Sequence, residues 1–132
     1  MTPKQHRTRA GDKASARSRR QVAEKFLDAA ELIGSEDGAA INVCVSNAIL
    51  AGIAAGDAIC IAAIGERYSG PDHTAAADFL RQVDLELGKR LRVLVGLKNA
   101  AHYGDHLLSA GDRDLALRQA TALVTAARDR TL

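Results

Sequence analysis

Two side chains that can take part in chemistry, Lys98 and His102, stand four residues apart in the apolar stretch LRVLVGLKNAAHYGD (91–105). On a helical wheel that turns about 100° per residue, both fall in the same arc as Leu87 and Leu91, and side chains four residues apart are neighbours. Histidine titrates near neutral pH, and lysine is a point positive charge. The pair is therefore our first candidate for acid–base chemistry beside a stabilised negative charge.

The apolar spacing around this pair predicts a helix over residues 87–103, with Gly104 as its C-terminal cap. A second helix, over residues 39–67, is apolar almost all round and is expected at the centre of the molecule. Further helices are expected over residues 17–33, over 73–88 after the N-cap Asp72, and after a last N-cap at Ser109 or Asp112. Neither strand-like alternation nor an internal repeat is present, so we predict an all-α fold, a bundle of four or five helices.

The central apolar stretch is long enough to cross a membrane, but it carries Asp57. A carboxylate near the centre of a span costs roughly 2.5–3.5 kcal/mol on insertion scales. We therefore predict a buried helix in a protein that binds no membrane. Gly52 and Gly56, four residues apart, predict a close helix crossing, either inside the subunit or between two subunits.

Three polar residues of this helix, Asn42, Ser46 and Asp57, share one face. Two interpretations stay open. Because a buried carboxylate without partners is costly, the three can be polar groups that cap or bridge elements within the core. Alternatively, they line a functional cleft, in which case Asp57 is a candidate substrate-binding residue.

Charge is distributed unevenly along the 132 residues. The first twenty carry seven basic residues against Asp12, a net charge of +6, so the remainder carries −4 of the total of +2. Residues 1–16 have no periodic apolar positions and are predicted to be a disordered basic arm, either a polyanion-binding tail or a solubilising terminus. Residues 17–132 are predicted to form one domain. Aromatic residues make up only 3%, which argues against stacking platforms for single-stranded nucleic acids.

The two cysteines, Cys44 and Cys60, lie in the same apolar stretch. On one helix they are roughly 24 Å apart, beyond the reach of a disulfide. Unpaired thiols and the lack of an apolar signal segment predict a cytoplasmic protein. No zinc-ligand spacing such as CxxC or HExxH is present, and we expect no metal ion or other cofactor.

Four features together resemble the HEPN superfamily over residues 18–130: LKNAAHYGD, the apolar helix NAILAGIAAGDAICIA, the SGPDH turn and an alanine-rich last helix. Members of this superfamily are small helical bundles of bacterial toxin–antitoxin pairs, defence systems and RNA-processing proteins. The resemblance implies a HEPN-like bundle and a homodimer. It also implies metal-independent cleavage of single-stranded RNA at a composite site formed by two subunits.

Carried over residue by residue, the resemblance places Lys98 at the family's arginine, Asn99 at its polar position and His102 at its histidine. Lysine in place of arginine removes the planar, two-pronged grip on a phosphate. The spacing is one residue shorter than in the family's ribonucleases, and the local string is closer to a branch whose motif ends in Ala-Asp-Tyr. His102 is expected to act as general base or acid and Lys98 to stabilise the phosphorane, with Asn99 or Tyr103 orienting a phosphate.

The sequence therefore predicts one of two functions. The first is a HEPN-like, RNA-directed protein, with His102 and Lys98 as catalytic candidates. The second is a non-enzymatic helical dimerisation module whose partner is a nucleotidyltransferase or another toxin–antitoxin component. In the second case the surface at Gly52 and Gly56 and the helix over residues 87–103 bury the partner, and the motif residues are interface contacts. A purely structural role also stays open, in which Lys98 extends from the edge of the core and His102 bonds Asp57 or a carbonyl at the C-terminal end of a helix. Only the basic arm favours a DNA-binding helix-turn-helix protein.

Overall fold

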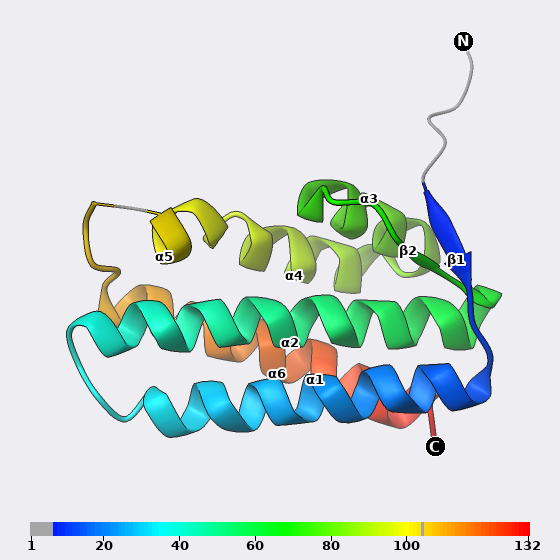
Figure 1. The fold of residues 1–132 in the computed structure, drawn as a ribbon, viewed down its shortest axis with the longest axis horizontal. Coiled ribbons are helices and arrows are strands. Elements are labelled where there is room, and N and C mark those ends of the chain that lie inside the picture. Colours follow the sequence, from blue (N-terminus) through cyan, green and yellow to red (C-terminus); the bar gives the residue numbers. More distant parts are fainter. Residues whose placement is uncertain (1–6, 104) are drawn as a thin grey trace, which may run out of the picture.

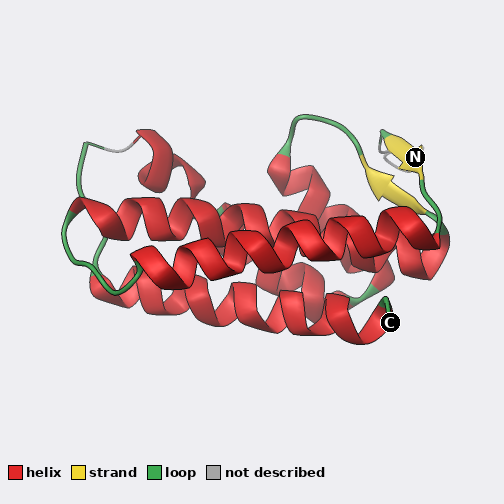
Figure 2. Cartoon of the chain, turned by 60° about the horizontal axis from the view of Figure 1, so that its bottom comes forward, coloured by secondary structure: helices red, strands yellow, loops and turns green. Residues whose placement is uncertain are grey.

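The structure, a computed structural model, describes residues 7–103 and 105–132 and is built almost entirely of helices (Figures 1 and 2). In chain order its elements are β1 (Thr8–Ala10), α1 (Lys13–Ile33), α2 (Ala39–Ile64), β2 (Glu66–Tyr68), α3 (His73–Val83), α4 (Leu85–Val95), α5 (Lys98–Tyr103) and α6 (Ala110–Arg130). The predicted all-α bundle is therefore confirmed.

Helix α2 is the centre of the bundle and contacts every other helix. In Figure 1, α1 lies below it, α3, α4 and α5 lie above it, and α6 lies behind. Its length and composition would allow it to cross a membrane, but 67% of its most apolar window is buried inside the bundle. Contacts with helices around most of its circumference explain why this helix is apolar almost all round.

The two glycines predicted to allow a close helix crossing do so inside the subunit. A Cβ at Gly52 would lie 2.5 Å from Leu94 Cδ1 of α4 and 3.3 Å from Leu123 Cδ1 of α6. A Cβ at Gly56 would lie 3.3 Å from Leu91 Cδ2. Both glycines are buried, so they are not available to a partner protein as the dimerisation hypothesis supposed.

The N-terminal prediction is wrong for part of its range. Residues 8–10 form β1, which pairs antiparallel with β2, and α1 begins at Lys13 instead of residue 17. The earlier start has a local cause, because Asp12 and Ser15 form a reciprocal capping box. Residues 1–6 of the predicted arm lie outside the described part of the chain. The predicted helix over 39–67 ends at Ile64, since Gly65 adopts a left-handed φ of 73°.

Helices α3 and α4 form a tight hairpin around one residue, Asp84. Asp84 ends α3, and its carboxylate accepts a hydrogen bond from Leu87 N at 3.1 Å, which caps α4. Near the turn, a Cβ at Gly88 would lie 2.5 Å from Arg81 Cα, so only glycine permits this approach. Each helix has eleven residues, and the hairpin therefore brings the start of α3 to the end of α4.

Candidate functional site

The helix predicted over residues 87–103 is interrupted at Gly96, which ends α4. Leu97 N then donates to Leu94 O at 3.0 Å, a tighter turn than the α-helical one, and α5 starts at Lys98. This turn shifts the residues that follow on the helical wheel. The buried side of α5 is formed by Ala101, whereas Lys98 is half-buried and His102 is exposed. The prediction that both lie on the apolar arc is therefore wrong for His102.

Asn42 of α2 fixes the position of α5. Its Nδ2 donates to Ala100 O at 3.5 Å, and its Oδ1 accepts from Leu108 N at 2.9 Å. One side chain thus joins α2, α5 and the segment before α6. For Asn42, the bridging interpretation of the polar face of α2 is the one that the hydrogen bonds support.

Asp57 lies fifteen residues further along α2, about 22 Å from Asn42. It is buried, and its Oδ2 accepts from Arg19 Nη2 at 3.1 Å. Burial raises the pKa of Asp57 to about 6, although the positive charges of Arg19 and Arg67 act in the opposite direction. The structure therefore places Asp57 in an ion pair between α1 and α2 and does not bring it to Lys98 and His102.

A polar cleft of ≈ 330 Å³ lies where the start of α3 meets the junction of α4 and α5. The α3–α4 hairpin creates this meeting point. Lys98 and Asn99 line the cleft from one side and His73 from the other. The remaining lining residues are Pro71, Asp72, Thr74, Val95 and Gly96.

His73 lines this cleft but is not among the predicted site residues, because its position in the first turn of a helix favours a surface or capping-region histidine. Its Nδ1 is buried and has no hydrogen-bond partner among the residues that the structure describes. Burial lowers the pKa of His73, and the positive charges of Lys98 and His102 lower it further, while Asp72 opposes them. Lys98 and His102 are 25 and 29 residues away from His73 in the chain, so the fold brings their charges near its imidazole.

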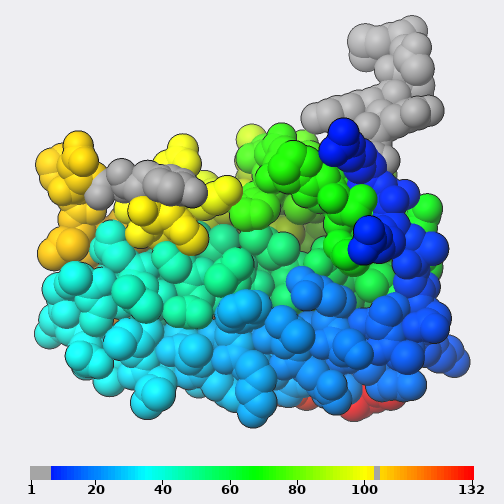
Figure 3. Space-filling view, viewed as in Figure 1, coloured from blue at the N-terminus to red at the C-terminus, as the bar shows by residue number. Residues whose placement is uncertain are grey.

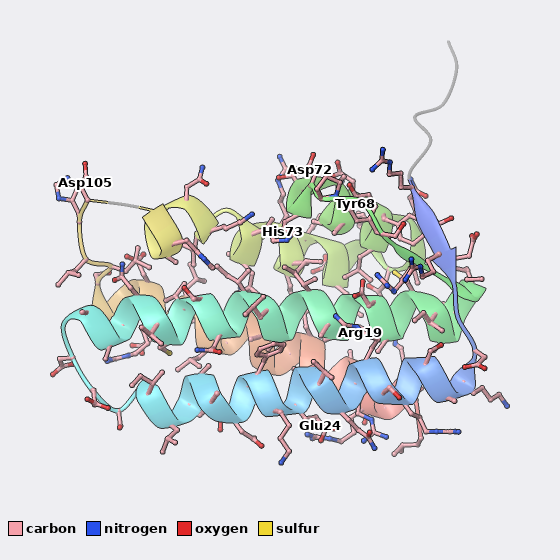
Figure 4. All side chains as sticks on the ribbon, in the orientation of Figure 1. Arg19, Glu24, Tyr68, Asp72, His73 and Asp105 are labelled. Carbon is pink, nitrogen blue, oxygen red and sulfur yellow. The ribbon has the colours of Figure 1, made fainter. Side chains whose placement is uncertain are left out.

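The turn before α3 holds His73 in place. Asp72 Oδ1 accepts from Thr74 N at 2.9 Å, so Asp72 is the predicted N-cap, and its backbone N–H donates to Tyr68 Oη at 3.3 Å. A Cβ at Gly70 would lie 2.7 Å from Tyr68 Cζ, which explains the small residue in this turn. Figure 4 shows Tyr68, Asp72 and His73 grouped where β2 leads into α3.

Of the predicted site residues, Lys98 and Asn99 line the cleft, and His102 lies one turn further on α5. The side chain of Tyr103 lies outside the described part of the structure. Within residues 7–103 and 105–132, no three His, Cys, Asp or Glu side chains are placed to hold a metal ion.

The imidazole of His73 and the ammonium group of Lys98 line this polar cleft, and the imidazole of His102 lies one turn further on α5. Such groups can transfer protons and stabilise an anion. Comparison with known proteins adds no further guide, because neither a family model nor a curated protein matches this chain.

Proposed function

We propose that this chain is a HEPN-like, RNA-directed protein that cleaves single-stranded RNA at the cleft between α3 and α5, in a toxin–antitoxin or defence setting. One observation carries the proposal: His73 of α3 and Lys98 of α5 line the same polar cleft, and the charges of Lys98 and His102 both lower the pKa of His73. Two proton-transfer groups and one cation are what metal-independent cleavage of a phosphodiester requires.

The reaction assigns a different task to each side chain. His73, neutral near pH 7 because its pKa is lowered, removes the proton from a ribose 2′-hydroxyl. The 2′-oxygen then attacks phosphorus, and Lys98 stabilises the charge of the phosphorane. His102, exposed to solvent, gives a proton to the departing 5′-oxygen. The products are a 2′,3′-cyclic phosphate and a free 5′-hydroxyl.

This arrangement also accounts for the short distance between Lys98 and His102 in the sequence. If His73 supplies the base, the motif on α5 must provide only the cation and the acid. The longer spacing between cation and histidine in the family's ribonuclease motif is then not required, because that motif also supplies the base. Lys98 acts as a point charge, which can follow the phosphorane without the fixed geometry of a guanidinium.

The test is incubation of single-stranded RNA with purified protein in EDTA, with the ends of the fragments analysed for 2′,3′-cyclic phosphate. We expect His73→Ala and His102→Ala each to slow cleavage by roughly 10²–10⁴-fold. His106→Gln, which removes an exposed imidazole outside the cleft, is the matched control and should cleave normally. Cleavage that both alanine variants retain at the wild-type rate would disprove the assignment.

A helical dimerisation module is the second candidate, and one observation favours it. Helices α1 and α2 border an open, mostly apolar groove of ≈ 560 Å³, lined by Val22, Phe26, Ala29 and Asn47 among others. Val22 is 38% exposed, whereas Ala23 beside it on the same helix is buried. We propose that a second copy of the chain covers this groove, with a nucleotidyltransferase or another toxin–antitoxin component as the alternative partner.

Light scattering after size-exclusion chromatography tests this second candidate. The wild type should elute with twice the mass of its 13.9 kDa chain, and Val22→Glu should elute as a monomer. Leu85→Glu, which charges an exposed leucine on α4, is the matched control and should remain a dimer. A monomeric wild type would disprove self-association.

A further inference from the structure

The small sheet carries two arginines directly opposite each other. In the antiparallel pairing of β1 with β2, Arg9 is the partner of Arg67. Side chains paired in this way stand on the same face with Cβ atoms ~4.5–5.5 Å apart, and like charges at this distance destabilise the sheet. Arg7 lies two residues before Arg9, on the same face, and its carbonyl accepts from Ser69 N at 3.0 Å. Three guanidinium groups are thus gathered on one sheet face.

Within the described part of the chain, no carboxylate forms an ion pair with an arginine of this face. Neither Arg7 nor Arg9 forms an ion pair there, and both are exposed. Glu66 accepts a hydrogen bond from Thr8 at 3.2 Å, but both residues belong to the opposite face of the sheet. Arg67 interacts electrostatically with Asp57, but the carboxylate of Asp57 already pairs with Arg19. The positive charge is therefore in excess.

The sheet is directly connected to the cleft. From Arg67 the chain runs through the Ser69–Asp72 turn to His73, six residues that span at most about 20 Å. Figure 3 shows β1, the residues around this turn and α5 on one continuous side of the molecule. A few nucleotides of an extended single strand would cover this distance.

We propose that Arg7, Arg9 and Arg67 bind backbone phosphates of single-stranded RNA and lead the strand into the cleft at His73. The inference rests on the proposed function, because it takes RNA as the substrate. A phosphate between Arg9 and Arg67 removes their mutual repulsion, and a guanidinium can grip it with two hydrogen bonds. With few aromatic residues available for stacking, recognition depends on charge and is independent of base sequence.

The experiment measures binding by fluorescence anisotropy with a labelled, fully 2′-O-methylated RNA of about 12 nucleotides, which lacks the attacking hydroxyl and cannot be cleaved. We expect Arg7→Gln/Arg9→Gln to weaken binding roughly tenfold and to reduce the slope of log K against log salt by about 1.4, since each lost phosphate contact to a single strand accounts for ~0.7. Arg90→Gln/Arg118→Gln, which removes two exposed arginines from α4 and α6, is the control and should bind like wild type.

A second variant separates binding from folding. Arg9→Glu replaces the like-charged pair by an opposite-charged pair with Arg67, so we expect a higher melting temperature together with loss of RNA binding. A merely structural role for Arg9 predicts the reverse, a lower melting temperature with binding retained.

Failure of this inference and failure of the proposed ribonuclease are distinguishable. If the β1 double variant binds the probe with unchanged affinity and salt slope, the inference is overturned, even if RNA is cleaved. If duplex DNA or anionic lipid vesicles bind as tightly as RNA and depend on the same arginines, the assignment to RNA is overturned. If a dinucleotide, too short to reach the sheet, is cleaved equally by wild type and the double variant while long RNA is bound less tightly, the inference is supported.

Discussion

The buried carboxyl of Asp57 makes the free energy of unfolding depend on pH, and the size of this dependence can be predicted. Burial raises the pKa of Asp57 from its ordinary 3.8 to about 6 in the folded protein. Between these values the folded state binds more protons than the unfolded state, so stability falls as pH rises. The contribution of this group is fully present below pH 3.8 and is lost as pH rises through about 6. A tenfold change in proton affinity is worth about 1.4 kcal/mol, so the loss amounts to roughly 3 kcal/mol.

Asp57→Asn removes this titration. We expect its free energy of unfolding, relative to that of wild type, to rise by roughly 2–3 kcal/mol between pH 4 and pH 7. In melting temperature the relative gain is on the order of 10 °C. The pKa values of Glu24 and Asp84 are lowered by hydrogen bonds, chiefly from Arg20 and Leu87 N respectively. Their effects occur in both proteins and cancel in the difference.

The assay is urea unfolding at a series of pH values, followed by far-ultraviolet circular dichroism. Asp28→Asn, which removes an exposed carboxylate from α1, controls for the loss of one negative charge. If the difference between Asp57→Asn and wild type stays constant from pH 4 to pH 7, or grows toward acid pH, the reasoning about this buried carboxyl is refuted.

Three further predictions concern packing, reactivity and capping. Gly52→Ala would place a Cβ 2.5 Å from Leu94 Cδ1, so we expect the free energy of unfolding in urea to fall by about 1–3 kcal/mol. Gly56→Ala, whose Cβ would lie 3.3 Å from its nearest neighbour, should change this free energy by less than about 1 kcal/mol. Equal losses in the two variants would contradict this. Burial raises the pKa of the Cys60 thiol to about 12, so mass spectrometry should find it unlabelled by a thiol reagent at pH 8 until urea unfolds the protein. Ser109→Ala deletes the cap of α6 and should destabilise the protein by about 1 kcal/mol; an unchanged melting temperature would contradict this.

Most of the helical framework could be predicted because its causes are local. The unbroken apolar stretch of α2 and the N-caps Asp72 and Ser109 are set by residues close together in the chain. The strands could not be predicted in this way. Each has three residues, and β1 becomes a strand only because β2, 56 residues further on at Glu66, supplies its hydrogen bonds.

The candidate site also has a part that follows from local sequence and a part that follows only from tertiary structure. The sequence alone determined that Lys98, Asn99 and His102 stand close together, because spacing along one short helix fixes their proximity. It did not determine which way His102 faces, because the helix breaks at Gly96 and α5 packs on α2, where Asn42 bonds Ala100 O. Only the tertiary structure brings His73 to Lys98. The α3–α4 hairpin turns at Asp84 and joins residues 25 apart, and this close approach rests on the contact of Gly88 with the α3 backbone.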